Sequence, residues 1–559
     1  MSHTTVDPSE VAEDAVASGE PVALPSLGGV VDGLAATALR GTAVARAAVS
    51  LSAENLRIAL GRSDVAPERG DWRFRDETWS TNPAYKRVAQ WYLAWCKAVE
   101  TVLDDVEATT DRHRAERAKF VMNVMTSAVA PTNSLLGNPA ALKKTFEAGG
   151  ANLVRGAEHF VADLRHNGGM PSTAKPGALK VGEDLALTPG AVIDKDEHAE
   201  VLQYTPTTDE VYERPVIVVP PPIGRYYFLD LRPGRSFVEY AVSRGLQTFL
   251  VSWRNPSTEQ SGWDIDTYAQ RILDVVDVVR ETTGSPDVNV IGFCAGGILQ
   301  AAVLNKLAAL GDDRIHSSAY AVTLLDFGQS APIGAFSSAR LLSLARWNSG
   351  RAGVISARAM GNAFTWMRPN DLVWNYWVNN YLMGEDPPVF DILSWNADGT
   401  NLPAALHKQF LDIFENNPLP EPGGLEALGV PIDLATIKVP AFVAGAVNDH
   451  LTPWKSTYRT TQLLSGECTF ALSNAGHIAS LVNPPGNPKA SYFTGPIDRD
   501  QSPAEWLEGA ERQTGSWWEH WAEWVSERSG QKAAAPAELG SSRFPVQGAA
   551  PGTYVRQPN

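Results

Sequence analysis

The chain has 559 residues, of which 44% are hydrophobic, and a formal net charge of −16. A chain of this length can bury a large core and exceeds the size of one ordinary domain, and its acidic charge argues against nucleic acid as a partner. The three cysteines, Cys96, Cys294 and Cys468, are too few and too scattered for a disulfide framework, which is typical of a reducing cell interior.

The first residues and the hydropathy of the chain give no membrane signal. The segment 1–7 lacks the basic region and apolar core of a signal peptide, and no apolar stretch reaches membrane-spanning length. We therefore expect a cytoplasmic protein without a transmembrane segment. Residues 1–25 are polar, acidic and small, which predicts a disordered arm.

Helical patterns follow this arm and predict a helical N-terminal domain over residues 26–195. Apolar residues recur with helical spacing at 34–60, 85–106 and 115–128, and strand signals are scarce. A join rich in glycine and proline begins at Asn167.

Strands and helices alternate after this domain. The strand-like runs are 199–204, 215–219, 248–253, 288–291 and 319–325, and the main helices between them are 266–280 and 298–310. This alternation predicts a mostly parallel, doubly wound sheet with right-handed crossovers, an α/β-hydrolase fold. We assign the catalytic core to residues 196–327 and 438–528.

The alternation stops between these two parts of the core. Residues 328–437 form an insertion at the place where α/β-hydrolases carry a lid, and we expect it to open for substrate. Its tryptophans and tyrosines, dense at 366–377 and 391–398, are explained either by core packing or by an apolar ligand channel. The tail, 529–559, is rich in Ala, Pro and Gly and is predicted to be loop-like.

The segment from Gly292 to Gly297, Gly-Phe-Cys-Ala-Gly-Gly, follows a β-branched strand and opens a helix. This is the pattern of a nucleophile elbow, with Cys294 where hydrolases usually have serine. Glycines flank the nucleophile because its neighbours on the strained turn have no room for a Cβ. The amino end of a helix also favours the thiolate over the thiol.

An elbow of this kind requires an acid and then a histidine later in the chain. Asp449 follows the strand-like run 439–445, and His477 follows the next one, 468–472. Catalytic groups of open α/β sheets gather beyond the carboxyl ends of the strands, so Cys294, Asp449 and His477 can converge there.

Other reactive side chains have simpler explanations. Cys96 and Cys468 fit buried hydrophobic positions in a helix and in a strand. His450, beside Asp449, could orient that carboxylate, contact substrate or simply pack. We assign no chemistry to the remaining histidines and no metal site.

Four separated segments carry a family resemblance: the elbow, Ser252–Pro256, Arg368–Tyr376 and Gly476–Pro485. Together they resemble the single-subunit polyhydroxyalkanoate synthases, from about Asp71 to the C-terminus. The resemblance implies that Cys294, Asp449 and His477 form the catalytic triad, that Trp395 lies near the pocket, and that the helical N-terminal domain serves dimerisation and association with polymer granules. One departure is Gly224-Arg225, where the family usually has Asn-Lys.

Further site residues follow from these motifs. The oxyanion hole needs the N–H of the residue after the nucleophile, Ala295, and a second donor from the loop after the first long core strand. Residues 220–222 of that loop are prolines without an N–H, so we name Ile223 as the second donor. Trp395, His450, Arg368 and Tyr226 are candidate substrate contacts.

The expected activity is transfer of a 3-hydroxyacyl group from coenzyme A to Cys294 and then to a hydroxyl, which builds a polyester. The partners would be 3-hydroxyacyl-coenzyme A, the growing chain, a second subunit, and the granule surface with its associated proteins. No cofactor is expected, because coenzyme A belongs to the substrate. The alternatives are a thioesterase or polyester depolymerase, although the chain has no Gly-X-Ser-X-Gly, and a non-catalytic granule scaffold.

Overall fold

The computed structural model describes residues 41–110, 112–328 and 339–558. The chain divides into two compact units: Met1–Lys175 with Arg358–Val389, and Pro176–Ala357 with Phe390–Asn559. The expected arm, 1–25, lies outside the described residues. Within those residues, no helix is both long and apolar enough to span a membrane.

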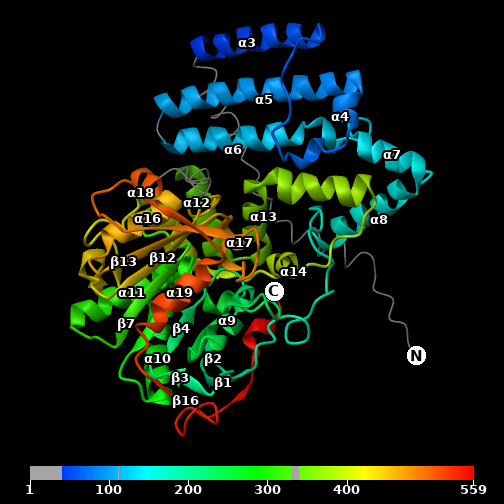
Figure 1. Ribbon diagram of the computed structural model, residues 1–559. Helices are drawn as coiled ribbons and strands as arrows, with labels where there is room; N and C mark the ends of the chain where they lie inside the picture. The colour runs from blue at the N-terminus through cyan, green and yellow to red at the C-terminus, as the bar shows by residue number, and fades with distance from the viewer. Residues whose placement is uncertain (1–40, 111, 329–338, 559) are drawn as a thin grey trace, which may run out of the picture. The chain divides into compact units, whose positions relative to one another are not determined.

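The first unit is helical, as expected for the N-terminal part of the chain. Its elements are α3 (Gly41–Ala59), η1 (Trp72–Phe74), α4 (Thr78–Thr81), α5 (Pro83–Thr109), α6 (Arg112–Ala128), η2 (Pro131–Asn133), α7 (Pro139–Glu147), α8 (Ala151–His166), most of α13 (Ala357–Met367) and the π-helical turns η6 (Asn370–Trp374) and η7 (Trp377–Leu382). Helix α5 packs between α3 and α6, and the three lie side by side (Figure 1). Asn82 caps α5 by accepting a hydrogen bond from the N–H of Ala84 at 2.9 Å.

Residues 358–389 belong to this unit although they lie in the expected lid. The rings of Phe160 on α8 and Tyr381 on η7 meet edge to face, 5.3 Å apart between centroids. The Tyr381 hydroxyl donates to Asp163 at 2.7 Å, and Asn152 donates to the carbonyl of Leu382 at 2.7 Å. The structure therefore divides the 328–437 insertion between two units, which differs from the expected single lid.

The second unit is built on an 11-stranded sheet, in the order β15-β14-β13-β12-β7-β6-β4-β5-β2-β1-β17. The strands are β1 (Gly190–Lys195), β2 (Ala199–Tyr204), β4 (Val216–Val219), β5 (Thr248–Trp253), β6 (Val288–Phe293), β7 (Ile315–Ala321), β12 (Ala441–Ala446), β13 (Cys468–Ser473), β14 (Ser491–Thr494), β15 (Glu511–Thr514) and β17 (Gly548–Ala549). The six strands from β13 to β5 are parallel, and antiparallel strands extend both edges. This confirms the expected α/β-hydrolase architecture.

Helices pack around this sheet (Figure 1). They are η3 (Tyr226–Leu229), α9 (Phe237–Ser243), η4 (Thr258–Gln260), α10 (Ile265–Thr283), α11 (Ala295–Leu310), α12 (Ala339–Ala352), α14 (Asp391–Ala397), α15 (Ala404–Asn416), η8 (Leu434–Thr436), α16 (Trp454–Leu463), α17 (His477–Leu481), α18 (Pro503–Gly509), α19 (Trp517–Ser526) and η9 (Tyr554–Arg556). Every residue of β6 is buried, because helices cover both faces of the parallel strands.

The end of the chain differs from the expected loop. Strand β16 (Lys532–Ala534) pairs with β3 (Glu210–Tyr212), and β17 adds to the sheet beside β1. Strand β1 itself falls within the range expected for the N-terminal domain. The remaining two-stranded pairs are β8 (Val354–Ile355) with β9 (Leu402–Pro403) and β10 (Glu426–Ala427) with β11 (Val430–Pro431).

Several tryptophans serve the core of this unit. Trp517, Trp518 and Trp521 of α19 are nearly inaccessible, and they share a cluster with Phe237 of α9 and Phe293 of β6. The Trp521 and Phe237 rings lie 4.7 Å apart. Core packing therefore explains these three tryptophans of α19.

We expect Trp521→Ala to lower the free energy of unfolding by about 4 kcal/mol, because it leaves a large cavity in this cluster. The matched control is Trp347→Ala, since Trp347 is 59% exposed, and its effect should stay within about 0.5 kcal/mol. Urea unfolding followed by near-UV circular dichroism measures both. Equal losses in the two variants would contradict the placement of α19 in the core.

Candidate active site

Cys294 lies at the turn between β6 and α11, with φ 50° and ψ −123°. This is an unfavourable region for a residue with a Cβ. The backbone of the neighbouring strand holds it there, since the Cys294 N–H donates to the carbonyl of Ala321 at 2.9 Å. The Thr323 hydroxyl donates to the carbonyl of Cys294, also at 2.9 Å. The expected elbow is therefore present as a strained turn that hydrogen bonds stabilise.

Three glycines allow the close crossing of strand and helix at this turn. A Cβ on Gly292 would lie 2.6 Å from the Cα of Gly297, and a Cβ on Gly297 would lie 2.6 Å from Cγ2 of Thr323. A Cβ on Gly296 would lie 2.8 Å from the carbonyl oxygen of Pro220. No real side chain fits at these distances, so the glycines are required for steric reasons.

Asp449 and His477 lie in the loops that follow β12 and β13. His477 Nδ1 donates to Asp449 Oδ2 at 2.7 Å. The other carboxylate oxygen accepts the N–H groups of Leu451 and Thr452 at 2.8 Å each, and the Thr452 hydroxyl donates to Oδ2 at 2.6 Å. These contacts fix the carboxylate, which in turn orients the imidazole.

The pair is almost completely removed from water: the side chain of Asp449 is 0% exposed and that of His477 is 5% exposed. Burial favours a higher pKa for Asp449, but the imidazolium and the Thr452 contacts outweigh it and hold that pKa below its ordinary value. Burial alone would lower the pKa of His477. The Asp449 carboxylate and, to a smaller extent, the Cys294 side chain outweigh burial and raise it. His477, held by Asp449, therefore has a raised affinity for a proton.

The two expected oxyanion donors are also adjacent to the elbow. Ala295 is the first residue of α11, and Ile223 lies in the loop after β4, the strand beside β6. Gly296 packs against the carbonyl of Pro220 in that loop. Neither N–H, of Ala295 or of Ile223, donates to any acceptor in residues 41–110, 112–328 and 339–558. Two unused donors thus flank the turn.

The candidate substrate contacts have different surroundings. Trp395 on α14 is partly buried, and its ring lies 5.2 Å from that of Phe228, which contacts Phe293 next to the nucleophile. Its indole N–H donates to the carbonyl of Arg225 at 2.7 Å, so only the ring is available to a ligand. His450 is partly buried in the Asp449 loop.

Tyr226 and Arg368 have other partners. Tyr226 is 3% exposed, packs in the core and donates its hydroxyl to the carbonyl of Pro551 at 3.4 Å. Because it has almost no exposed surface, we remove it from the candidate substrate contacts. Arg368 belongs to the first unit, where its guanidinium pairs with Asp371.

The other cysteines lie in the elements expected for them. Cys96 is in α5 and Cys468 in β13, and burial raises the pKa of both thiols, that of Cys468 to about 11. A raised pKa disfavours the reactive thiolate. Neither has the surroundings of a nucleophile.

Sequence reasoning missed Thr452 and the charged residues that hold α14. The spacing of Thr452, three residues after Asp449, is a local signal, because short aspartate loops often hydrogen-bond the second and third residues that follow. Arg225, Asp391 and Asp398 had no such signal, since their partners lie more than 150 residues away.

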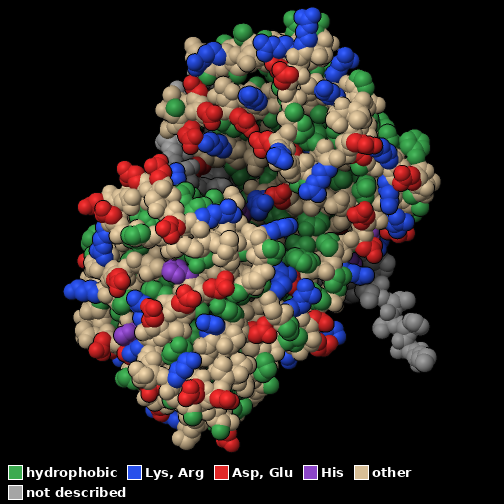
Figure 2. Space-filling model, viewed as in Figure 1, with side chains coloured by type: hydrophobic (Ala, Val, Ile, Leu, Met, Phe, Trp, Pro, Cys, Tyr) green, Lys and Arg blue, Asp and Glu red, His purple; other side chains and the backbone are tan. Residues whose placement is uncertain are grey.

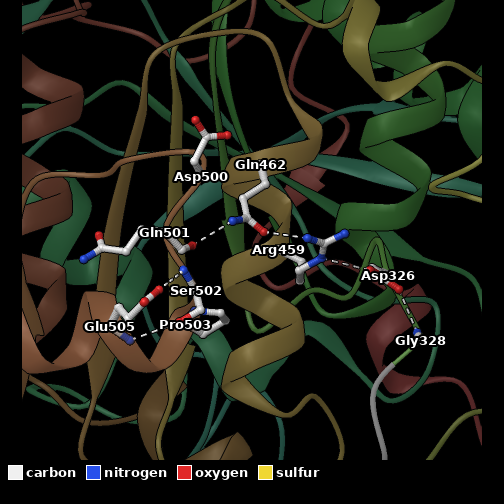
Figure 3. A pocket seen from close by; sticks show the side chains of 9 residues that line it. All are labelled: Asp326, Gly328, Arg459, Gln462, Asp500, Gln501, Ser502, Pro503 and Glu505. Carbon is white, nitrogen blue, oxygen red and sulfur yellow. Dashed lines mark hydrogen bonds and ion pairs between the residues drawn. The ribbon is translucent and has the colours of Figure 1, made fainter.

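A separate polar pocket of about 450 Å³ lies against α16 (Figure 3). Its lining residues are Asp326, Gly328, Arg459, Gln462, Asp500, Gln501, Ser502, Pro503 and Glu505. Arg459 pairs with Asp326 at 3.2 Å across it. The lining includes none of the candidate catalytic residues. Within the part of the chain that the structure describes, no three His, Cys, Asp or Glu side chains are grouped as a metal site.

Comparison with known proteins gives two family matches. Residues 70–241 match the model described as the N-terminus of poly-beta-hydroxybutyrate polymerase (PhaC), and residues 232–484 match the alpha/beta hydrolase fold. Among solved structures, the monoacylglycerol lipase of Paleococcus ferrophilus is 14% identical, covering 59% of this chain and 99% of its own, with a TM-score of 0.34.

Curated relatives match most of the chain. Poly(3-hydroxyalkanoate) polymerase 1 of Ectopseudomonas oleovorans is 44% identical over 500 residues, which is 89% of each chain. The poly(3-hydroxyalkanoate) polymerase subunit PhaC of Cupriavidus necator is 38% identical, covering 89% of this chain and 85% of its own. With such identity over nearly its whole length, and with an α/β-hydrolase sheet that presents a cysteine at its elbow, the chain belongs to the poly(3-hydroxyalkanoate) polymerase family.

Proposed function

We propose that the protein is an acyltransferase that polymerises (R)-3-hydroxyacyl-coenzyme A into polyhydroxyalkanoate, with release of coenzyme A. The observation that carries the proposal is the buried His477–Asp449 pair in a polymerase-family chain whose elbow residue is a cysteine. Cys294 is the nucleophile, His477 the general base and Asp449 the residue that orients and charges the imidazole.

Before the first half-reaction the Cys294 proton has passed to His477, and the resulting thiolate attacks the thioester carbonyl. The new carbon–sulfur bond forms, the bond to the coenzyme A sulfur breaks, and His477 returns the proton to the leaving thiolate. One thioester replaces another, so the acyl group stays activated. The N–H groups of Ala295 and Ile223 stabilise the negative charge on the carbonyl oxygen in between.

In the second half-reaction a 3-hydroxyl attacks the thioester held on Cys294. His477 takes the hydroxyl proton, an oxygen ester forms, and the Cys294 sulfur leaves and recovers a proton from the imidazolium. The product carries a new 3-hydroxyl at its end, so the cycle can repeat. Burial of His477 and Asp449 supports this course, because water near the thioester would hydrolyse it.

The proposal also includes the cofactor requirement, the oligomeric state and the location of the enzyme. It needs no metal or cofactor, because the protein groups carry every proton and coenzyme A arrives with the substrate. We propose a cytoplasmic homodimer at the surface of the polyester granule and its associated proteins. Exposed apolar side chains on the first unit support a contact with an apolar surface: Leu136, Phe146, Val154, Val161 and Leu164. Acidic and basic side chains are interspersed on the face of the molecule in Figure 2.

Two alternative functions use the same fold. A thioesterase or depolymerase would release free 3-hydroxy acid, and a granule scaffold would release nothing. The purified protein, supplied with 3-hydroxybutyryl- or 3-hydroxyoctanoyl-coenzyme A, should release coenzyme A and form polymer. Free acid as the main product would favour the hydrolase instead.

Cys294→Ala should abolish coenzyme A release, because it removes the nucleophile. Cys294→Ser should retain only a small residual rate, since a hydroxyl is ionised much less readily than a thiol. Cys96→Ala and Cys468→Ala are matched controls and should keep most of the activity. Comparable loss in all three alanine variants, measured by coenzyme A release, would refute the assignment.

Substitutions of His477 and of Asp449 should slow different steps of the reaction. His477→Gln should remove acylation almost completely. Asp449→Asn should still release one equivalent of coenzyme A in a rapid burst but elongate very slowly, because a hydroxyl needs the full base and a thiol does not. Rapid-quench measurement of coenzyme A separates the two steps, and normal turnover by Asp449→Asn would exclude its role.

The charged pair also predicts a pH-dependent stability. His477, whose folded-state pKa is raised, stabilises the fold fully below its ordinary pKa of about 6.5, and this contribution is lost as the pH rises through the folded value. Asp449, whose pKa is lowered, contributes above about pH 4. Asp449→Asn should therefore cost about 3 kcal/mol near pH 5.5 and clearly less near pH 10.

Denaturant unfolding at the two pH values measures this difference. Asp277→Asn is the matched control, because Asp277 forms a half-exposed surface pair with Arg314 and should cost less than about 1 kcal/mol. A constant cost of Asp449→Asn from pH 5.5 to 10 would contradict a protonated His477 in the folded protein.

A further inference from the structure

The loop that carries Ile223 is held by hydrogen bonds on both sides of that residue. The Thr400 hydroxyl donates to the carbonyl of Pro222 at 3.3 Å, and the Gly224 N–H donates to the Thr400 oxygen at 2.8 Å. The carbonyl of Arg225 accepts the Trp395 indole N–H at 2.7 Å. The Ile223 N–H itself donates to no acceptor among the described residues, whereas the Pro222 carbonyl before it and the Gly224 N–H after it both have partners.

The side chain of Arg225 holds this loop from behind. It is 3% exposed, and its Nε donates to Asp398 Oδ1 at 2.7 Å. Its two terminal nitrogens donate to backbone carbonyls near the end of the chain: to Val555 at 3.0 Å and to Gln557 at 2.5 Å. One planar guanidinium therefore ties its own loop to two other segments, that of Asp398 and residues 555–557, through donors fixed in a fork.

Each of these segments is itself fixed. Asp398 also accepts the Tyr227 hydroxyl at 3.1 Å, so it is tied to the residues that follow Arg225. The segment before Val555 is held on β2, where the buried carboxylate of Glu200 accepts the N–H groups of Thr553 and Tyr554, each at 2.9 Å. A displacement of Arg225 would therefore move the loop against two rigid supports.

The helix that carries Trp395 is secured in the same way at its other end. Asp391, the first residue of α14, is fully buried and pairs with Arg232 at 2.9 Å and Arg235 at 2.6 Å. With Asp398 just after the last residue of α14, arginines hold both ends of this short helix. This part of the expected lid is thus ion-paired to the catalytic core.

We infer that Arg225 is a positioning residue for the oxyanion hole. It binds Asp398 and the carbonyls of Val555 and Gln557 together, and so holds the Ile223 N–H where the oxyanion develops. The inference rests on the proposed function, since it assigns a support to the donor that the mechanism uses. Displacement of a catalytic donor by about 1 Å is enough to cost a hundredfold in rate.

Arg225→Met is the test, because methionine keeps roughly the length of the side chain but donates no hydrogen bond. We expect the maximal rate of coenzyme A release to fall about 100-fold, with KM changed less than about threefold. Alkylation of Cys294 by iodoacetamide forms no oxyanion, so its rate should stay within about twofold of wild type. A fall in alkylation equal to the fall in turnover would show general damage to the site and would overturn the inference.

The matched control is Arg214→Met, at the opposite end of β4. Arg214 likewise bridges a carboxylate, that of Asp287, and a backbone carbonyl, that of Arg528. It should leave the maximal rate within about threefold of wild type. Equal losses in the two variants would show that the loss of any such bridge disturbs the unit.

A second probe reads the oxyanion directly. A trifluoromethyl ketone analogue of the acyl-coenzyme A adds the Cys294 sulfur and places an oxyanion in the hole, whereas a thioether analogue has no carbonyl. Arg225→Met should weaken binding of the ketone about as much as it lowers the rate, and leave binding of the thioether unchanged. An equal loss of affinity for both analogues would mean that Arg225 supports binding of the acyl-coenzyme A and not the oxyanion.

Asp398→Asn is the second variant, needed if Arg225→Met does not fold. It keeps the shape of the side chain, removes one anchor of Arg225, and should lower the maximal rate about 10-fold with the same contrast between the two analogues. An unchanged rate would overturn the inference. Failure of the wild-type protein to release coenzyme A would instead reject the proposed function.

Discussion

The rest of the site depends on the close crossing of β6 and α11 at Cys294. The crossing exists only because Gly292, Gly296 and Gly297 have no Cβ, and because the elbow residue is held at φ 50° by a hydrogen bond to β7. The order of the strands in the sheet places the other two residues of the site. Strands β7, β12 and β13 are parallel neighbours, so the loops at their carboxyl ends bring Asp449 and His477 to the nucleophile.

The parts that could be predicted from sequence are those whose causes are local. The glycines of the elbow, the β-branched strand before it and the helix after it all occur within about ten residues, and the two loops of Asp449 and His477 each follow a clear strand. The prolines of the β4 loop have no N–H and can be excluded as oxyanion donors from sequence alone. Ile223 as the second donor is a prediction that follows from this. Helical periodicity located helices of the first unit but not its boundary, since the expected range to residue 195 includes β1 of the sheet.

The parts that could not be predicted depend on distant partners. Arg225 and Asp398 are 173 residues apart, and Arg225 and Val555 are 330 apart, so no local pattern indicates either contact. The 328–437 insertion is predicted as one lid because the alternation of strands and helices stops there, whereas packing assigns 358–389 to the helical unit. Tyr226 was misjudged for a related reason: an aromatic residue beside a functional loop has the same sequence signature whether it faces substrate or core.

Gly224 restricts how this loop could be exchanged with those of relatives. It has φ +83°, and a Cβ there would lie 3.1 Å from Cζ2 of Trp395. Asparagine tolerates such a backbone better than most residues, so the obstacle to the Asn-Lys pair usual in the family is the tryptophan ring and not the turn itself. Trp395 is in turn bonded to the carbonyl of Arg225. Positions 224, 225, 395 and 398 are therefore coupled by contact, and a graft that swaps a single member would disturb the other three.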